Sequence, residues 1–373
     1  MPKVRERRLA LLRLTAFTLF ACFLAAGPPA AFGRDLPVQS LEPAGVTYSR
    51  AQVLDWIDDT TFAVGRWDGT ISIFRIPHDG EFGPVIIQSM ATPSGRGVEM
   101  LTALDKDSFI TSDGAGQLAL WTRRPSPDSG KPQDFALSEE PSYDSAAGTA
   151  NSATFLDVAG GRYIVSGHES GDILIWRESN GGLELKKTVH LPSPNPIPSP
   201  YPLRNIRGLA PWGTNIIAGS EDGDLVAISI PDGQEVFRIR YNPNAKRGIN
   251  SVSALGNWLL VTNCSVGSSD KNLWLFDLSS TPPVLRDSEN LVLDTQRPQV
   301  FNFDAVLVEQ DGVPGFISST EEGLLWAGKI DGDQLVITGI TKVASEGGAK
   351  LQLAPRGPLI AAAAYQIWLF RER

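Results

Sequence analysis

The sequence predicts an all-β protein made of seven repeated units, each a four-stranded antiparallel sheet. The chain has 373 residues with 36 glycines and 27 prolines, so tight turns are frequent. One pattern recurs along it: a short apolar run, a turn of Gly, Asp, Glu or Ser, and an alternating strand that ends in an aromatic residue. No such unit can bury both faces of its sheet alone. We therefore expect the units to stack around an axis as a seven-bladed β-propeller.

The first hairpin shows the pattern clearly. Thr61 to Gly65 is the apolar run, Arg66 to Gly69 is the turn, and Thr70 to Phe74 is the alternating strand. The hairpins expected in the later units span residues 108–121, 162–176, 215–228, 258–276, 315–328 and 359–370. Their turns recur about 50 residues apart, which is the spacing of a repeat architecture.

Two further strands complete each unit. The expected first strands are the apolar segments 51–56, 100–104, 153–158, 206–210, 251–255, 305–308 and 351–353. The clearest expected fourth strands are 85–88, 183–189, 235–240 and 334–340. The seventh unit has only three strands before the chain ends at Arg373. We expect Asp35 to Leu41 to supply the strand that closes this last blade.

The N-terminal 33 residues have the composition of a secretory signal. The segment begins with basic residues, continues through the 13 apolar residues Leu14 to Ala26, and ends with the small-residue site Ala31-Phe32-Gly33. We predict cleavage before Arg34, a single domain over residues 34–373, and a periplasmic or secreted protein. An uncleaved anchor, or a lipid anchor at Cys22, is the alternative.

The net charge limits the kinds of partner that the protein can bind, and the cysteine content limits its disulfide bonds. The formal net charge is −9 and becomes more negative when the basic N-terminal segment is removed. An acidic chain without a basic patch repels phosphate backbones, so we expect no nucleic-acid partner. No other apolar run reaches membrane length. After cleavage Cys264 has no cysteine to pair with, and we expect it to be a small buried apolar residue.

The units resemble those of the WD-repeat propeller family. Asp68 to Phe74 and Asp222 to Leu225 match the family's Asp-Gly turn and following strand, and aromatic residues occupy its Trp position at Phe74, Trp121, Trp176, Phe276 and Phe370. The family's Gly-His pair before each blade is absent. The resemblance therefore implies that the family's buried His–Ser–Asp–Trp hydrogen-bond network forms in no blade. Because the motifs match only loosely, the sequence is also compatible with quinone-dependent and lactonase-type propellers.

Catalytic constellations are absent from the sequence. The three histidines, His78, His168 and His190, occupy different repeat positions and should be solvent-facing loop residues. No glycine-rich phosphate loop occurs, and we expect neither a metal nor a cofactor. The function predicted is a non-catalytic platform for a protein partner. The alternative is an exported hydrolase or quinone-dependent dehydrogenase with its site in the central channel.

The WD resemblance places the turns between the second and third strands on one face. Five residues of these turns are the candidate protein-binding residues: Arg66, Trp67, His168, Glu169 and Tyr365. Two loops between blades should reach the same face. In residues 191–202 every second residue is proline. We expect this segment to form either a stiff spacer between blades or a ligand for an aromatic groove. Residues 125–151 are rich in Gly, Ser and Pro, and we expect a mobile loop.

Overall fold

The protein is all-β in the part of the chain that the computed structural model describes. That part comprises residues 38–41, 51–76, 84–124, 134–179, 181–198, 204–266, 270–294, 296–297, 299–310, 312–342, 352–356, 359–363 and 367–371. Within it, the only helical element is a 3-10 turn, η1 (Ser145–Ala147). All strand pairs are antiparallel, as the sequence predicts.

Four sheets contain four consecutive strands each, and we call each set a unit. The first unit has β2 (Ala51–Trp56), β3 (Thr61–Arg66), β4 (Thr70–Arg75) and β5 (Val85–Ala91). The second has β6 (Val98–Asp105), β7 (Ser108–Asp113), β8 (Leu118–Arg123) and β9 (Phe135–Glu139). The third has β10 (Ala150–Val158), β11 (Gly161–His168), β12 (Asp172–Ser179) and β13 (Gly182–His190). The fourth has β14 (Ile206–Trp212), β15 (Asn215–Ser220), β16 (Asp224–Ser229) and β17 (Glu235–Arg240).

The fifth and sixth units are joined into one eight-stranded sheet, a departure from the separate sheets that the sequence predicts. The fifth unit has β18 (Ile249–Leu255), β19 (Trp258–Val266), β20 (Leu273–Asp277) and β21 (Val284–Glu289). The sixth has β22 (Gln299–Gln310), β23 (Val313–Thr320), β24 (Leu324–Asp331) and β25 (Gln334–Lys342). Strand β19 continues beyond its pairing with β18, and its last three residues pair with the start of β22. This pairing satisfies backbone groups that the extension would otherwise leave open.

The first and last described strands share a sheet. The seventh unit has β26 (Gln352–Arg356), β27 (Leu359–Ala363) and β28 (Ile367–Arg371), and β1 (Val38–Leu41) is its fourth strand. In the antiparallel register, Val38 lies opposite Phe370 and Leu41 opposite Ile367. The predicted contribution of the N-terminal strand to the last sheet is confirmed.

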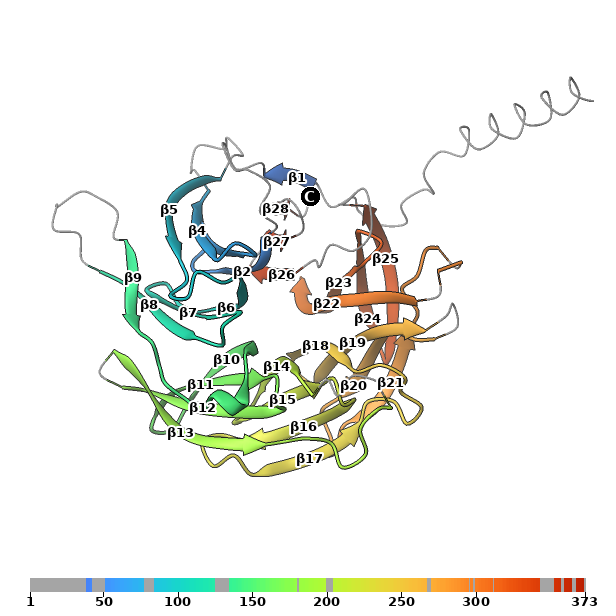
Figure 1. Ribbon diagram of the computed structural model, residues 1–373. Coiled ribbons are helices and arrows are strands. Elements are labelled where there is room, and N and C mark those ends of the chain that lie inside the picture. Colours follow the sequence, from blue (N-terminus) through green and yellow to red (C-terminus); the bar gives the residue numbers. More distant parts are fainter. Residues whose placement is uncertain are drawn as a thin grey trace, which may run out of the picture.

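The sheets follow one another around a common centre in chain order (Figure 1). The first strand of every unit lies innermost, and the fourth strand lies on the outside. We call the first strands, β2, β6, β10, β14, β18, β22 and β26, the inner strands. Each inner strand contacts the next one in this order, and β26 contacts β2, so the contacts form a closed cycle.

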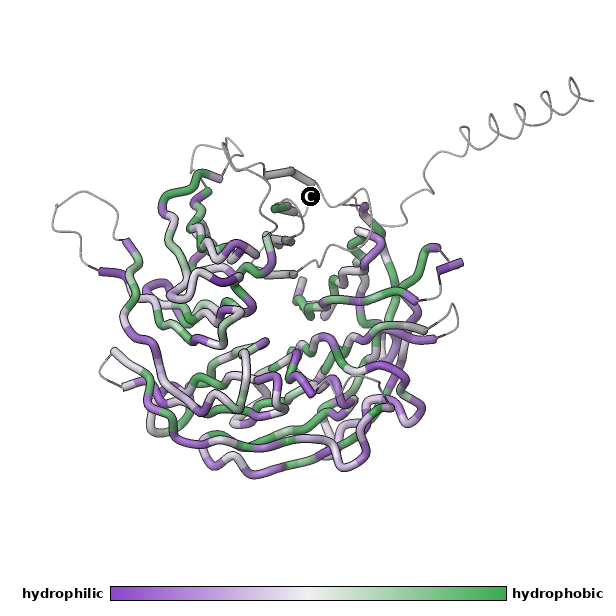
Figure 2. Tube along the Cα trace, viewed as in Figure 1, coloured by the Kyte–Doolittle hydropathy of each residue, from purple (hydrophilic) through white to green (hydrophobic). Residues whose placement is uncertain are grey.

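The apolar core is divided among the interfaces between neighbouring units. Apolar residues concentrate within the sheets, and hydrophilic ones concentrate in turns and outer edges (Figure 2). One buried cluster joins Val165 and Ile175 of the third unit to Ile216 and Ile228 of the fourth. The other clusters likewise take their residues from two adjacent units, and one joins the first unit to Ile367 of the seventh. Each sheet is therefore buried by its neighbours.

Glycines near the ends of three second strands allow neighbouring units to pack closely against each other. An ideal Cβ on Gly65 would lie 2.5 Å from Val98, and one on Gly167 would lie 2.5 Å from Ile206. The third case is Gly219, where a Cβ would lie 2.7 Å from Ile249. In each case the apolar residue begins the next unit's inner strand. The glycine in the repeated apolar run therefore provides space for the neighbouring unit.

The predicted mobile loop over residues 125–151 contains ordered structure in its described part. Strand β9 supplies the fourth strand of the second unit, and Phe135 at its start is buried. Phe135 packs edge-on against Phe109, with ring centroids 5.0 Å apart. The expectation of a single mobile loop is wrong there, because an aromatic anchor outweighs the polar composition around it.

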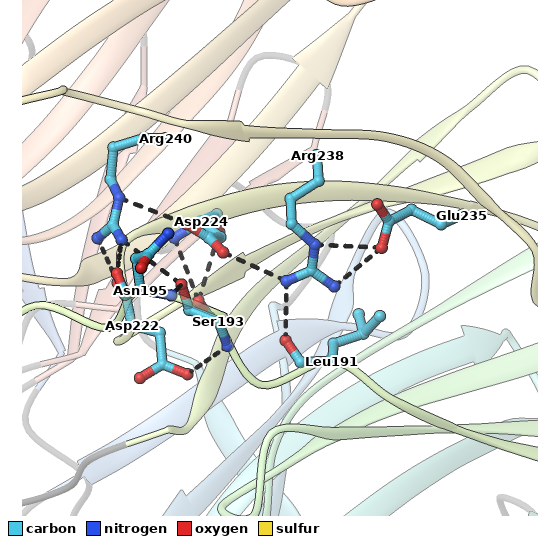
Figure 3. A network of polar contacts seen from close by, with 9 residues as sticks. Leu191, Ser193, Asn195, Asp222, Asp224, Glu235, Arg238 and Arg240 are labelled. Atoms are coloured by element: carbon cyan, nitrogen blue, oxygen red, sulfur yellow. Dashed lines mark hydrogen bonds and ion pairs between the residues drawn. The ribbon is translucent and has the colours of Figure 1, made fainter.

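Basic side chains hold the proline-rich segment 191–198 against the fourth unit (Figure 3). Arg238 Nη1 donates to the carbonyl oxygen of Leu191 at 3.1 Å and lies 3.2 Å from Asp224 Oδ2. Arg240 donates to the carbonyl oxygens of Asn195 and Asp222. These contacts favour the stiff-spacer interpretation of the segment, since its backbone is held by its own chain.

Candidate functional site

A one-residue shift in strand register recurs at the start of the inner strands. In the first six units, one residue near the start of the inner strand has no partner on the second strand. We call these the bulge residues: Gln52, Glu99, Asn151, Arg207, Asn250 and Phe303. A bulge leaves its extra residue outside the ladder and redirects its side chain. The described register of the seventh unit runs without a shift.

The bulge residues surround a central cavity of about 310 Å³. Its lining comes from the inner strands of the first six units and from Glu221, at the start of the turn between β15 and β16. All the bulge residues except Gln52 line it directly, and Gln52 is bonded to one that does. Since bulges often serve to re-aim side chains at functional sites, this cavity is the candidate functional site.

One wall of the cavity carries the carboxylate of Glu99, which a neighbouring amide outside the lining binds. Gln52 Nε2 donates to Glu99 Oε2 at 2.8 Å. Gln52 is only 4% exposed, and its Oε1 is buried without a hydrogen-bond partner. A buried acceptor without a donor costs about 1–3 kcal/mol. Because of this free-energy cost, packing alone does not account for a glutamine at position 52.

A second wall carries an ion pair. Arg207 Nε donates to Glu221 Oε1 at 2.9 Å, and Glu221 Oε2 is buried without a partner. The Glu221 backbone is fixed as well, because its N–H donates to the carbonyl oxygen of Asn205 at 2.9 Å. A Cβ on Gly248 would collide with the backbone of Glu221. Glycine at position 248 therefore lets the chain pass close to this acid.

Aromatic and amide groups form the third wall. Phe301 and Phe303 line the cavity and stack with ring centroids 5.7 Å apart and an interplanar angle of 9°. Asn250 Nδ2 donates to the carbonyl oxygen of Asn302 at 2.8 Å. The amide thus links the inner strands of the fifth and sixth units.

Side chains also tie the other inner strands together. Asp55 Oδ2 accepts from Ala103 N at 2.9 Å, and Ser152 Oγ donates to the carbonyl oxygen of Ile206 at 2.8 Å. Ala305 N donates to Ser251 Oγ at 3.1 Å. These contacts between units fix the cavity wall, so the candidate site is built on rigid strands.

The predicted protein-binding residues do not form one exposed cluster. Arg66 and His168 end the second strands of their units and are buried. Trp67 and Glu169 follow them in the turns and are exposed, Trp67 by 55%. Tyr365 lies outside the described residues. The prediction of Arg66 and His168 as exposed contacts is wrong, because both side chains, at the ends of their second strands, are buried.

The buried residue at the end of a second strand has a structural role. In the second unit, the equivalent residue Asp113 accepts from Ala115 N at 3.0 Å and from Ser94 Oγ at 2.6 Å. Asp113 thereby holds both its own turn and a preceding loop. In the first unit, burial lowers the pKa of Arg66, an effect that the charge of Asp68 opposes.

His168 is the centre of a buried network in the third unit. Its Nδ1 lies 3.1 Å from the carbonyl oxygen of Gly148, so Nδ1 carries the proton, and Nε2 accepts from Ser166 Oγ at 2.9 Å. Trp176 Nε1 donates to the same Ser166 Oγ at 3.0 Å. The expectation that His168 faces solvent is wrong. A His–Ser–Trp network forms in this unit, but it is not the family's His–Ser–Asp–Trp network, because the backbone carbonyl of Gly148, and not an Asp, pairs with His168. This histidine forms a Gly-His pair with Gly167, but the pair ends the second strand, whereas the family's pair precedes each blade.

The network predicts a pH-dependent loss of stability. Burial lowers the pKa of His168, although Gly148, Asp172 and Glu169 oppose the shift. Since the folded-state pKa is below the unfolded value, the unfolded chain binds more protons and stability falls as pH drops below about 6.5. We expect the urea midpoint to fall more between pH 7.5 and pH 5.5 in the natural chain than in His168→Gln. Equal falls would contradict the assignment.

Cys264 and His190 are the remaining thiol and imidazole that the structure describes. Burial raises the pKa of the Cys264 thiol to about 12, and the side chain is 2% exposed, as expected for a buried apolar residue. His190 pairs with Asp172, and His78 lies outside the described residues. Among the described residues, no three His, Cys, Asp or Glu side chains gather in a way that could hold a metal ion.

The bulge residues were missed by sequence analysis although a signal exists. In five units the bulge residue is polar and follows Ala, Val or Ile directly: Ala51-Gln52, Val98-Glu99, Ala150-Asn151, Ile206-Arg207 and Ile249-Asn250. In three of these five units the predicted first strand begins after the bulge residue, so the prediction leaves the polar position in the preceding loop.

Comparisons with known proteins give no identity for the chain. No model of a known protein family matches it, and no curated protein matches its sequence. None of the described segments forms a helix that is both long and apolar enough to cross a lipid bilayer. Function must therefore be argued from the site itself.

Proposed function

We propose that this chain is a seven-bladed β-propeller of the WD-repeat kind that serves as a non-catalytic platform for a protein partner. The closed cycle of inner strands supports the propeller, as do the core clusters shared by neighbouring units. The pairing of β1 with β28 agrees with a ring closed by both ends of the chain.

The exposure of Trp67 carries the binding proposal. An indole with 55% of its surface in solvent is unusual for a residue of this size, and Trp is enriched among the residues that dominate protein interfaces. Trp67 lies in the turn between β3 and β4, which corresponds to the turn of the fourth unit that begins at Glu221. Trp67 and the central cavity then belong to the same face of the propeller.

We also propose that the protein is exported. Residues 1–33, which lie outside the described residues, have the composition of a secretory signal. A protein exported in this way works in the periplasm or outside the cell.

Photo-crosslinking tests the partner surface. We expect a photoreactive amino acid at position 67 to crosslink a specific protein in the native envelope, while the same group at Val236 does not. Val236 is the matched control because it is 40% exposed and lies on the outer strand β17. With the crosslinked protein purified, Trp67→Ala should weaken binding at least tenfold, and Val236→Ala should change it less than about twofold. Equal effects of the two variants would refute the assignment of this surface.

The central cavity favours a second candidate function, an exported propeller enzyme. Glu99, Arg207 and Glu221 line the same cavity, and a group of titratable side chains in one cavity is what such an enzyme needs. A hydrolase of lactones or a quinone-dependent dehydrogenase would place its site there. Turnover of a lactone or sugar that Glu99→Gln abolishes would establish this candidate in place of the platform.

A further inference from the structure

The buried residue that ends the second strand distinguishes the first unit from the next five. In each of these six units, this residue lies opposite the inner-strand residue that directly precedes the bulge. In the second to sixth units its side chain is hydrogen-bonded to a neighbouring group, and these residues are Asp113, His168, Ser220, Asn263 and Thr320. In the first unit the position is occupied by Arg66.

Arg66 is a buried cation whose donors are not used by the described part of the chain. The residue is only 6% exposed. Among the described residues, none accepts a hydrogen bond from its guanidinium or forms an ion pair with it. Asp68 acts on Arg66 through its charge alone, and its Oδ1 accepts from Thr70 N at 2.9 Å. Burial of a charge without an acceptor costs free energy, so packing alone does not account for arginine at this position.

The chemistry of the guanidinium determines what complements it. Arginine has N–H donors and no acceptor, and its planar fork matches a carboxylate, which can accept two hydrogen bonds from it. The Arg66 nitrogens are not among the fully buried, unpartnered polar atoms of the described residues. The guanidinium therefore keeps a small contact with solvent, and an acceptor from outside can reach it.

Arg66 and Trp67 are consecutive residues of one tight turn. Gly69 N donates to the Arg66 carbonyl oxygen at 3.1 Å and closes this turn. The loop of residues 94–97 packs against it, since a Cβ on Gly97 would lie 2.8 Å from the Trp67 carbonyl oxygen and one on Gly69 would lie 2.7 Å from that of Arg96. The exposed indole is thus held on a well-supported turn, directly after the buried cation.

The charges of these two segments favour an anion. Residues 66–69 and 94–97 contain the bases Arg66 and Arg96 and one acid, Asp68. Asp113, in the neighbouring turn, is occupied by donors of its own chain, because it accepts from Ala115 N and from Ser94 Oγ. A carboxylate is therefore attracted to this turn more than a cation is.

We propose that Arg66 binds a carboxylate of the protein partner while Trp67 packs against an apolar side chain of the same segment. The carboxylate belongs to an acidic side chain or to a C-terminus. Its oxygens accept from the guanidinium, and exclusion of water from the interface strengthens these charge-assisted hydrogen bonds. The carboxylate site rests on the partner surface proposed above and adds the chemistry that this surface recognises.

Titration of the full chain with short peptides tests the charge preference. One peptide is acetyl-Gly-Glu-Leu-Gly-amide, two controls carry Gln or Lys in place of Glu, and a fourth carries Gln but has a free C-terminus. Fluorine NMR of protein labelled with fluorotryptophan detects binding at the resonance that Trp67→Phe removes. We expect a carboxylate peptide to bind at least roughly tenfold more tightly than the blocked Gln and Lys peptides. The tighter of the two carboxylate peptides identifies the source. Equal binding of all four, or no shift with either carboxylate peptide, overturns the proposal.

Arg66→Met separates binding from a structural role. Methionine keeps an apolar stem without the charge, so it should weaken carboxylate-peptide binding at least roughly tenfold and leave the urea midpoint unchanged or higher. Loss of stability with unchanged peptide affinity would make Arg66 a structural residue. Arg66→Lys keeps the charge without the planar fork and should weaken binding severalfold, which carries the test if Arg66→Met does not fold. Arg75→Met, at the far end of the same hairpin, is the control and should change affinity less than about twofold.

The crosslinked partner distinguishes the carboxylate site from the platform itself. If Trp67→Ala weakens binding of that partner and Arg66→Met does not, the partner surface stands and the carboxylate site is refuted. If a group at position 67 crosslinks no protein, the platform fails, and the peptide titration still decides whether this turn prefers a carboxylate.

Discussion

Replacing Trp176 by alanine is expected to lower the free energy of unfolding by about 3–5 kcal/mol. The side chain is 1% exposed and lies in the cluster that joins the second and third units. Its Nε1 donates to Ser166 Oγ, and its ring meets Tyr143 edge-on, with centroids 6.2 Å apart. Alanine leaves a cavity between two units and removes the donor that Ser166 needs. Urea unfolding followed by circular dichroism measures the loss.

Trp176→Phe separates the contribution of packing from that of the hydrogen bond, and Trp67→Ala is the control at an exposed site. Trp176→Phe keeps most of the ring and should cost about 1–2 kcal/mol, which includes the lost donor to Ser166. Trp67→Ala removes an indole of which 55% is exposed and should change stability by less than about 0.5 kcal/mol. If Trp176→Ala cost no more than Trp67→Ala, Trp176 would not belong to the core between units.

A second large effect is expected where Gly219 meets Ile249. A Cβ on Gly219 would lie 2.7 Å from Ile249 Cγ2, so Gly219→Ala should overpack the interface of the fourth and fifth units and cost about 1–3 kcal/mol. Ile249→Ala removes a fully buried side chain and should cost about 2–5 kcal/mol. Urea unfolding of both single variants provides the two reference values.

The double variant tests whether the two residues contact across the interface. In Ile249→Ala the Cβ remains and would lie 3.4 Å from a Cβ on residue 219, which relieves one clash, whereas Val252 Cγ1 stays 2.8 Å from that Cβ. The double variant should still be more stable than the sum of the two losses predicts, by about 0.5–3 kcal/mol. Simple additivity would mean that Ile249 is not the side chain for which Gly219 makes room.

The repeated hairpins were predictable because local chemistry determines them. Gly69 and Gly223 lie at positive φ, 79° and 89°, in the turns that the Asp-Gly pattern predicts. The alternating strands that follow these turns lie where their pattern placed them. Local patterns of this kind need no knowledge of the neighbouring units.

Features that depend on distant parts of the chain were not predictable. The joining of the fifth and sixth units requires that β19 and β22 extend toward each other, and neither sequence shows this alone. The fourth strand of the second unit was not predicted because its apolar residues, Phe135 and Leu137, lie within a long polar segment. His168 was read as exposed because its partners Ser166 and Gly148 are identified only by folding.

The pairing of β1 with β28 constrains when the molecule can finish folding. Ile367 to Arg371 are synthesised long after Val38 to Leu41, the strand with which they pair. The earlier sheets can form while the ribosome is still working, but this sheet forms only after all the units between its strands have been made. Deletion of β28 would therefore leave β1 without its partner and the cycle of units without this closing contact.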